Sequence, residues 1–554
     1  MFIAETRTGR FEGVPEDGAI AFHGVPFARP PIGERRFRAP QQLPDSSELR
    51  HAQSSGPASY QVNPRNQTKV QELLVALGDH FPGVKNSPPF SSTTYFQAEV
   101  SEDCLYLDIW VPRPPTSEKL PVFVYYHGGA NAGSSGSMLL ERGGNLARQE
   151  NVIVVRPSYR LGALGWVHFG LVSSELSEAI NLGVQDQMAA LNWISENIAA
   201  FGGDPQNITI GGESAGATAV SHLLLNAQSR PLFRRAILQS LSPFNQWSTQ
   251  QKSEAMSVIE LYMLLLKSDS YEQLLKTDPD HFLAVNLALG RYFDADTNCA
   301  WRPLGAVVDG QIVPHQPAVH LAETPLPADG LEVMIGFAKD EWQFFRGHTA
   351  TNQTGRRRDV ENVMSQVVGP ERAVTLYDDF SKLHPNHSPG DLLGDMMSCE
   401  FFKFSSLQIA ENLARAGIST HVFEFAFELP GQGGRLRAFH TGDMPFIWRN
   451  FAAEDLKRWP AFEGLSPADI SATSETFGRY YGAFIRGEPI GQAWPSFDTE
   501  RESILWLGKE IYAVDHLLTA EIQAFRDGGI STVRELETQL VNNVHGATRS
   551  RVPI

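Results

Sequence analysis

The chain has few cysteines, no surplus of basic residues and no long apolar run. Its 554 residues include three cysteines, Cys104, Cys299 and Cys399, a sparse and odd set that excludes a disulfide framework and suits a reducing compartment. Lys and Arg number 46 against 63 Asp and Glu, and the net charge of −17 disfavours binding to nucleic acid or to an anionic membrane. No apolar run reaches the length of about 18 residues that a membrane-spanning helix needs.

Several motif classes are missing as well. The sequence contains no H-E-x-x-H, C-x-x-C, P-loop or G-x-G-x-x-G motif, so no metal, cofactor or nucleotide is predicted. The first residues, MFIAETRTGRFEGV, lack the basic start and apolar core of a secretory signal. We therefore expect a cytoplasmic protein without nucleic-acid or membrane partners, present as a monomer or a homodimer.

The remaining sequence alternates short apolar runs with helical patterns. Apolar, β-rich runs occupy residues 122–126, 152–155, 236–238, 333–335 and 421–425. Near-continuous apolar strands are typical of a parallel sheet that is buried on both faces. Between two of these runs, apolar residues recur at helical spacing from Gln185 to Ala199. The alternation predicts an α/β fold, with a mostly parallel twisted sheet and helices on both of its faces.

The predicted domain organisation is one domain over residues 1–554, interrupted by three unlike stretches. Residues 51–100 are rich in Ser, Pro, Gln and Asn, whereas residues 250–300 and 350–400 have helical patterns. In an open α/β sheet, insertions at the carboxyl ends of the strands build the binding site. We interpret the first stretch as a loop insertion and the other two as helical pocket walls. Surface elaboration explains any single one equally well.

The most informative stretch is FGGDPQNITIGGESAGATAV, residues 201–220. It places Ser214 between Gly212 and Gly216, where an apolar strand pattern ends and an Ala-rich helix pattern begins. A sharp strand-to-helix turn needs small residues on either side of its corner, and it exposes the corner side chain. The helix N-terminus beneath Ser214 also favours negative charge. The stretch predicts a nucleophile elbow.

A serine nucleophile needs N–H donors for the oxyanion that forms during acyl transfer. The residues His127-Gly128-Gly129-Ala130 directly follow the predicted strand 122–126. Adjacent glycines allow backbone amides to turn inward without a side-chain clash. We predict an oxyanion hole made by the N–H groups of Gly129, Ala130 and Ala215.

The serine also needs a base and an acid that orients the base. The predicted strand 333–335 is followed by Asp340 and Glu341, and the residues alone do not choose between these two acids. Among 16 histidines, His440 lies in a Gly-bearing loop after the strand 421–425. The order Ser214, acid, His440 is the order that an α/β-hydrolase requires.

Beyond these single motifs, the chain resembles the type-B carboxylesterase family, which includes the cholinesterases. The stretch FGGDPQNITIGGESAG resembles the nucleophile signature of the family, and EDCLYLDIWVP, residues 102–112, resembles its second signature. FHGVPFARPPIGERRFRAP, NLGVQDQMAALNWISENIAAFGGDP and VDGQIVP match further stretches. The resemblance spans nearly the whole chain and implies an α/β-hydrolase fold with lid and pocket insertions.

The resemblance also implies roles for individual residues. The family acid is the third member of a K-D-E triplet, which is Glu341 here. The family histidine corresponds to His440. Ser240 and Asp443 would form a second shell beneath that histidine, although the family usually has Glu where Asp443 stands. Trp247 falls where the family lines its acyl pocket.

The sequence departs from the family pattern at three points. Cys104 lacks an upstream cysteine with which to form the usual disulfide bond, so we expect a reduced thiol. Ala130 replaces the third glycine of the oxyanion loop and keeps its N–H. Cholinesterases carry an upstream Trp that holds the cationic choline, whereas the first Trp of this chain is Trp110. We therefore expect neutral esters to be preferred to choline esters.

The predicted function is a serine carboxylesterase that hydrolyses small-molecule carboxylic esters. A Ser-His-Glu triad of Ser214, His440 and Glu341 would act through an acyl-enzyme intermediate. The alternative is an acyltransferase or lactone-forming cyclase that uses the same triad. A non-enzymatic adhesion-type relative is a third class, but such proteins typically lose the nucleophile, and this chain retains all three triad residues.

Overall fold

The computed structural model describes residues 2–77, 99–112, 118–242, 249–250, 252–297, 304–346, 355–451, 460–465 and 467–535. Within these ranges the dominant feature is an eleven-stranded sheet. Its strands lie in the spatial order β3 (Val14–Glu16), β4 (Ala19–Pro26), β8 (Tyr106–Pro112), β10 (Ile153–Pro157), β9 (Leu120–Tyr126), β11 (Gly203–Glu213), β12 (Arg235–Gln239), β15 (Glu332–Ala338), β16 (Ser419–Phe425), β17 (Ile504–Leu507) and β18 (Ile511–Val514).

The middle of this sheet is parallel and its edges are antiparallel. The pairings from β10 through β9, β11, β12, β15 and β16 to β17 are all parallel. The pairs β3–β4, β4–β8, β8–β10 and β17–β18 are antiparallel. Three small sheets accompany it, formed by β1 (Ile3–Thr6), β2 (Gly9–Glu12) and β5 (Leu49–His51), by β6 (Ala58–Ser59) and β7 (Val100–Ser101), and by β13 (Thr249–Gln250) and β14 (Ala306–Val307).

Both faces of the central strands are buried, because successive side chains of a strand point to opposite sides. Val122 and Val124 of β9 belong to one hydrophobic cluster, together with residues of the helices that follow β11 and β15. Phe123 and Tyr125 of the same strand belong to a second cluster on the opposite face. This explains why these strands are almost continuously apolar in the sequence.

Helices cover the two faces and extend beyond the sheet. Their bounds are α1 (Gln67–Leu77), α2 (Gly144–Glu150), α3 (Ala163–Trp166), α4 (Leu182–Asn197), α5 (Ala215–Leu225), α6 (Lys252–Leu265), α7 (Tyr271–Lys276), α8 (Pro279–Thr297), α9 (Pro317–Glu323), α10 (Gln343–Arg346), α11 (Arg357–Val368), α12 (Pro370–Leu383), α13 (Pro389–Ser398), α14 (Phe404–Arg415), α15 (Met444–Trp448), α17 (Pro467–Arg486) and α18 (Thr519–Asp527). A π-helical segment, Cys399–Lys403, joins α13 to α14.

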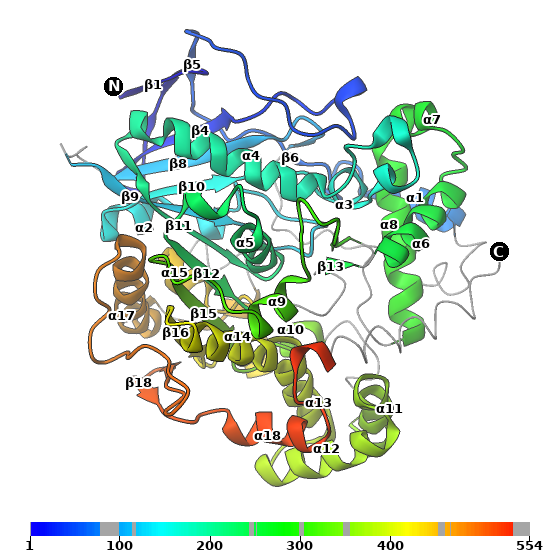
Figure 1. Ribbon diagram of the computed structural model, residues 1–554, viewed down its shortest axis with the longest axis vertical. Helices are drawn as coiled ribbons and strands as arrows, with labels where there is room; N and C mark the ends of the chain where they lie inside the picture. Colours follow the sequence, from blue (N-terminus) through cyan, green and yellow to red (C-terminus); the bar gives the residue numbers. More distant parts are fainter. Residues whose placement is uncertain are drawn as a thin grey trace.

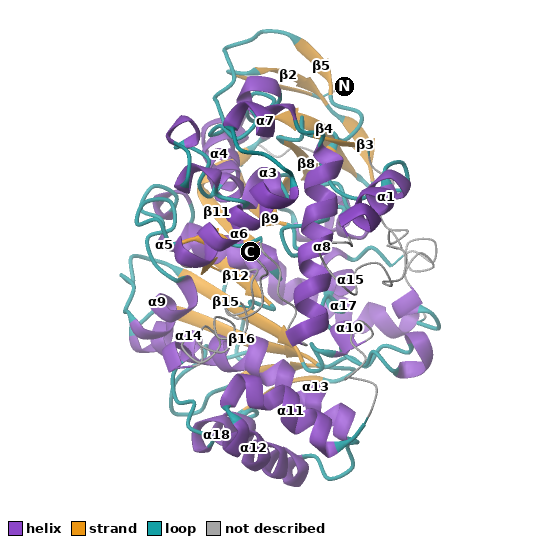
Figure 2. Cartoon of the chain, turned by 90° about the vertical axis from the view of Figure 1, so that its right-hand side faces the viewer, coloured by secondary structure: helices purple, strands orange, loops and turns teal. Residues whose placement is uncertain are grey.

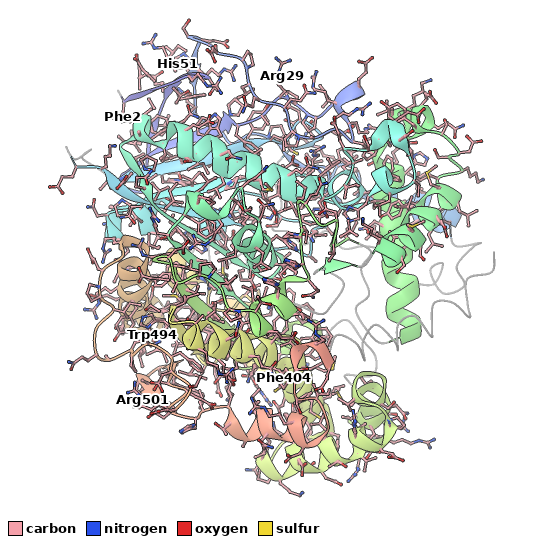
Figure 3. The ribbon with its side chains drawn as sticks, viewed as in Figure 1. Phe2, Arg29, His51, Phe404, Trp494 and Arg501 are labelled. Atoms are coloured by element: carbon pink, nitrogen blue, oxygen red, sulfur yellow. The ribbon has the colours of Figure 1, made fainter. Side chains whose placement is uncertain are left out.

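Four groups of helices show how the sheet is surrounded. Figure 2 shows α9 and α14 on one side of β12, β15 and β16, with α15 and α17 on the other side. Helices α6, α7 and α8 stand together at the right of Figure 1, and α11, α12 and α18 lie at its lower end. Figure 3 shows Phe404 and Trp494 inside the lower half of the molecule, where both are fully buried, whereas Arg501 lies at the periphery.

The five predicted strands are confirmed as β9, β10, β12, β15 and β16, each with bounds that differ from the apolar run by a few residues. The predicted helix 185–199 begins three residues earlier, at Leu182, because the apolar face continues to that residue, and its last turn is a separate 3-10 segment. Of the stretches interpreted as insertions, 250–300 contains α6 to α8 and 350–400 contains α11 to α13. The stretch 51–100 contains α1, and its residues 78–98 lie outside the described part.

Two cysteines are described, and both Cys104 and Cys399 are buried free thiols. Burial raises the pKa of the Cys104 thiol to about 12, so the group stays protonated and packs as an apolar side chain. The third cysteine, Cys299, lies outside the described residues. Across the described chain, no helix combines the length and the apolar character needed to cross a membrane.

Candidate active site

Ser214 occupies a strained corner between β11 and α5. Its φ of 57° and ψ of −123° lie outside the regions that a serine ordinarily adopts, and its side chain is buried. The two flanking glycines are required by space. A Cβ atom on Gly216 would lie 2.0 Å from the carbonyl oxygen of Tyr126, and one on Gly212 would lie 2.3 Å from Gly216. The chain can therefore turn this sharply only with glycine at both positions.

The predicted oxyanion loop lies directly against this corner. Strands β9 and β11 are parallel neighbours with Tyr126 opposite Gly212, so the loop after β9 meets the turn after β11. A Cβ atom on Gly128 would lie 3.2 Å from Ser214 Cβ. Gly129 and Ala130 follow with φ of 99° and 56°, and the carbonyl of Gly129 accepts hydrogen bonds from two later amides of the loop. These left-handed conformations reverse the chain beside Ser214.

Glu341 and His440 form a buried hydrogen-bonded pair. Nδ1 of His440 lies 2.6 Å from Oε2 of Glu341, although the two residues are 99 positions apart in the sequence. The other carboxylate oxygen of Glu341, Oε1, accepts a hydrogen bond of 2.7 Å from the N–H of Ala338. Glu341 is fully buried and His440 is 3% exposed, so water does not compete for this contact. The end of β15 thus fixes the acid, and the acid fixes the imidazole ring.

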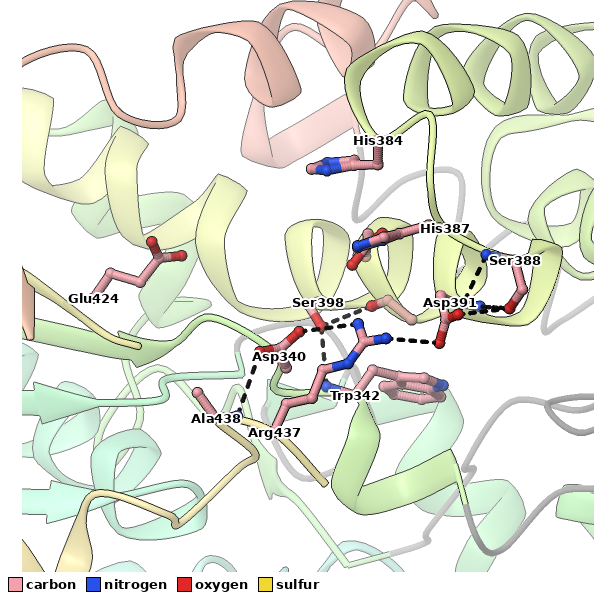
Figure 4. Close-up of polar contacts among 12 residues, drawn as sticks. Asp340, Trp342, His384, His387, Ser388, Asp391, Ser398, Glu424, Arg437 and Ala438 are labelled. Atoms are coloured by element: carbon pink, nitrogen blue, oxygen red, sulfur yellow. Dashed lines mark hydrogen bonds and ion pairs between the residues drawn. The ribbon is translucent and has the colours of Figure 1, made fainter. Parts of the chain in front are cut away.

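Asp340, the other acid that the sequence left open, points to different partners. Its backbone N–H donates to the carbonyl of Ala438 over 2.9 Å, and its Oδ1 lies 3.6 Å from Nη1 of Arg437. Arg437 in turn contacts Oδ1 of Asp391 on α13 at 3.2 Å. Figure 4 shows this chain of contacts from Asp340 through Arg437 to Asp391. Asp340 therefore braces the loop that carries His440, while Glu341 contacts the ring.

A residue that sequence reasoning missed lies at the second ring nitrogen. Nε2 of His440 approaches Oε1 of Glu213 to 3.2 Å, and Glu213 is the residue immediately before Ser214. Glu213 is 3% exposed. Its position inside the G-x-S-x-G motif was a usable signal, since the residue before the corner ends β11 next to the nucleophile. A buried carboxyl group at that place is an additional titratable group within the site.

Burial and mutual charge set the protonation of this group. Burial opposes the charged imidazolium, but the carboxylates of Glu213 and Glu341 outweigh it and raise the pKa of His440 to about 9. Burial likewise raises the pKa of Glu213 to about 8, with the charge of His440 acting in the opposite direction. These groups therefore share protons and titrate as a unit over the neutral to mildly alkaline range.

Aromatic rings enclose His440. The ring centroids of Phe345 and Phe402 both lie 5.2 Å from the imidazole centroid, and that of Phe344 lies at 5.8 Å. Phe402 belongs to the π-helical segment between α13 and α14. These contacts limit the movement of the imidazole and exclude water from the Glu341 pair.

The remaining predicted site residues are placed as follows. Asp443 is buried, and its Oδ2 accepts a hydrogen bond of 2.8 Å from Nε2 of Gln239, the residue before Ser240. Gln239 is held in turn by the hydroxyl of Tyr481, which donates to Oε1 over 2.8 Å. Ser240 is buried and has a positive φ of 49°. Trp247, assigned to the acyl pocket, lies outside the described residues.

Burial and a nearby charge also affect Asp443. Burial raises the pKa of this carboxyl to about 7, and the negative charge of Glu341 adds to the rise. Asp443 is therefore readily neutral in the folded protein, unlike an exposed aspartate. Its hydrogen bond with Gln239 connects the segment that follows His440 to the end of β12.

Comparison with known proteins agrees with this architecture. A model of the carboxylesterase family matches residues 2–525, and the chain belongs to that family. It is 29% identical to phenmedipham hydrolase of Pseudarthrobacter oxydans and 28% identical to para-nitrobenzyl esterase of Bacillus subtilis, each over 92% of this chain and 95% of the relative. A solved carboxylesterase structure from Geobacillus stearothermophilus superposes with a TM-score of 0.78 at 29% identity, covering 95% of this chain and all of that one.

Family membership establishes the general chemistry. The chain is a serine carboxylic ester hydrolase with the α/β-hydrolase fold, as the sequence predicted. Its substrates are small-molecule esters.

Proposed function

We propose that this chain hydrolyses carboxylic esters through a triad of Ser214, His440 and Glu341 and an acyl-enzyme intermediate. The observation that carries the proposal is the buried contact of 2.6 Å between His440 and Glu341, on loops that lie beside the strained corner at Ser214. The relatives phenmedipham hydrolase and para-nitrobenzyl esterase are both named as hydrolytic enzymes, the second as an esterase. No relative reported above carries the name of an acyltransferase or cyclase.

In the proposed reaction, neutral His440 accepts the proton of the Ser214 hydroxyl as its oxygen attacks the ester carbonyl. The negative charge of the tetrahedral intermediate is stabilised by the N–H groups of Gly129, Ala130 and Ala215. The imidazolium, held by Glu341, returns its proton to the departing alcohol. Water then attacks the acyl-enzyme by the same route and releases the carboxylic acid.

The substrate side of the proposal is a neutral ester. Residues 51–100 of the sequence contain no Trp. Among aromatic residues, Trp holds a quaternary ammonium group best in a cation–π contact. A neutral acyl and alcohol group therefore suits this chain better than a choline ester does.

A pre-steady-state measurement tests the acyl-enzyme. Mixing the enzyme with excess para-nitrophenyl acetate should release a rapid burst of nitrophenol equivalent to about one molecule per active site, followed by a slower steady rate. The burst requires that deacylation be slower than acylation. The second substrate is therefore para-nitrophenyl pivalate, a neutral ester whose hindered acyl group slows the attack of water on the acyl-enzyme. Mass spectrometry of the quenched protein should place the acyl group on Ser214. Turnover with the acyl group found on another residue would contradict the proposal.

The pH dependence should reveal the charge of Glu213. The carboxylate at Nε2 favours the imidazolium, so replacing it in Glu213→Gln should lower the pKa of His440. Neutral His440 would then persist to lower pH. We expect the acid limb of kcat/KM to move down by about one pH unit or more, measured with a neutral aryl ester.

The matched control for this experiment is Asp340→Asn. Asp340 is a buried carboxylate of the same region whose contacts are with Ala438 and Arg437 instead of the imidazole ring. Its acid limb should stay close to that of the wild type. An acid limb that is the same in Glu213→Gln and in the wild type would mean that Glu213 is already protonated when His440 titrates.

A further inference from the structure

Three side chains of the types that commonly bind metals lie together outside the active site, where α12, α13 and α18 meet. His384 follows the last residue of α12, His387 lies in the turn to α13, and Asp395 is on α13. One donor atom from each of the three residues lies within 4.8 Å of the other two. Figure 4 shows the rings of His384 and His387 one above the other.

The geometry of the group is close to that of a coordination shell. Nδ1 of His387 lies 2.6 Å from Oδ2 of Asp395, and the two imidazole centroids are 5.1 Å apart with 16° between the ring planes. Ligand atoms around a tetrahedral metal with bonds of about 2.0–2.1 Å are separated by about 3.3 Å. Small side-chain rotations therefore bring the three donors onto one ion. The histidine side chains are 25% and 28% exposed, so an ion can enter from solvent.

A fourth residue orients one of the histidines. Oε1 of Glu521, on α18, lies 3.1 Å from Nε2 of His384. A carboxylate that holds a metal-binding histidine by a ring nitrogen is the usual outer partner of such a site. The Glu521 contact also connects α18 to the group, so side chains from all three helices or their ends take part.

The local charge favours a dication. Oε2 of Glu521 lies 3.7 Å from Nζ of Lys403, and that ammonium group also contacts Oε1 of Glu424 at 2.9 Å. The carboxyl groups of Asp395, Glu521 and Glu424 outnumber the single ammonium group of Lys403 among these contacts. A divalent ion among them would offset this excess of carboxyl groups.

We propose that His384, His387 and Asp395 form a binding site for a divalent transition-metal ion of the zinc type. Two imidazoles and one carboxylate suit zinc, whereas magnesium and calcium prefer oxygen ligands. Water completes the coordination shell. The site is structural in this proposal, because it joins the end of α12 and the start of α13 and contacts α18 through Glu521.

The position of α13 connects this site to the catalytic loops. Asp391, one turn before Asp395, contacts Arg437 on the His440 loop. At the other end of α13, Oγ of Ser398 accepts a hydrogen bond of 3.0 Å from the N–H of Trp342, the residue after Glu341. An ion that fixes α13 thereby stabilises the support of both the acid and the base.

The site is tested by metal binding to the full-length chain. After removal of metals with a chelator, the protein is dialysed against zinc and analysed by mass spectrometry for bound metal. The wild type should bind about one zinc ion per chain at this site, and the double variant His384→Gln/His387→Gln should lose it. Excess magnesium should not displace the zinc.

The matched control is the double variant His315→Gln/His320→Gln. These two rings are also stacked, with centroids 4.3 Å apart, but no carboxylate contact is found for either ring among the described hydrogen bonds and ion pairs. The control should retain the zinc of the wild type. If His384→Gln/His387→Gln fails to fold by circular dichroism, Asp395→Asn takes its place, since it keeps the side-chain shape and should weaken zinc binding at least about tenfold.

Thermal unfolding gives an independent readout. Zinc at about a hundredfold excess over its dissociation constant should raise the transition temperature of the wild type by about 2 °C, a small shift because the chain is large. The shift should be absent in the His384 and His387 variant and present in the control. A wild type that binds no zinc, or a variant at these residues that binds zinc as the wild type does, overturns the proposal.

Discussion

Replacement of Ser214 by alanine is expected to lower kcat for a neutral aryl ester by about 10³–10⁶-fold. Alanine retains the Cβ atom, so the strained corner with φ of 57° should form as before. It lacks the oxygen that attacks the carbonyl, and therefore no acyl-enzyme can form. The remaining rate comes from substrate binding and from the N–H groups near the corner. Steady-state kinetics with para-nitrophenyl esters measure the loss.

The control for this variant is Ser221→Ala, two turns further along α5. Ser221 is also buried, and its hydroxyl donates to the carbonyl of Thr218 within the helix over 2.7 Å. Its loss should affect stability slightly and turnover little. Both variants should show the circular dichroism spectrum of the wild type. Retention of a tenth of the wild-type activity by Ser214→Ala would exclude Ser214 as the nucleophile.

Replacement of Glu341 by glutamine is expected to lower kcat by about 10⁴-fold, the scale of loss found when the acid of such a triad becomes an amide. Glutamine can still accept a hydrogen bond from Ala338, but it lacks the negative charge beside Nδ1 of His440. The imidazolium that forms during attack then loses its stabilisation. The amide also presents an N–H₂ group that favours the wrong tautomer of the histidine.

Asp340→Asn again provides the comparison, because the residue is the immediate neighbour of Glu341 and is almost as deeply buried. Its amide oxygen can still accept the hydrogen bond that Ala438 donates over 3.4 Å. We expect a far smaller loss than for Glu341→Gln. Equal losses in the two variants would mean that the charge of this turn matters as a whole and that Glu341 has no separate role. Single-turnover kinetics of Glu341→Gln should show that its chemical step is slower than that of the wild type.

The sequence was most informative where a local constraint acts on a few consecutive residues. Gly212 and Gly216 are recognisable because no side chain fits at either position, and the strands are recognisable because both faces of the sheet are covered. The carboxyl ends of adjacent parallel strands meet at one edge, which is why the order of Ser214, acid and His440 carried structural information. These features depend little on details of the loops.

Other features depend on contacts between distant segments and were not predictable. The residues alone could not decide whether Asp340 or Glu341 contacts His440, because that depends on the exact turn after β15, where adjacent side chains point in different directions; only the family resemblance named Glu341. The contact of Gln239 with Asp443 joins residues 204 positions apart, and neither residue type signals the pairing. The group of His384, His387 and Asp395 does not match the H-E-x-x-H or C-x-x-C motif, so the sequence predicted no metal.

Because β9 pairs with β11, the spacing of the reacting groups is independent of the range of substrates. The turn at Ser214 and the loop at Gly129 follow neighbouring strands in the middle of the sheet, so their separation is set by backbone hydrogen bonds between those strands. Helices α6 to α8, α11 and α12 lie outside this unit, whereas α13 contacts the catalytic loops. Laboratory evolution toward a new ester should therefore accumulate substitutions in those helices and leave the rate with a small activated ester nearly constant. The range of substrates can change while the reacting groups keep their spacing.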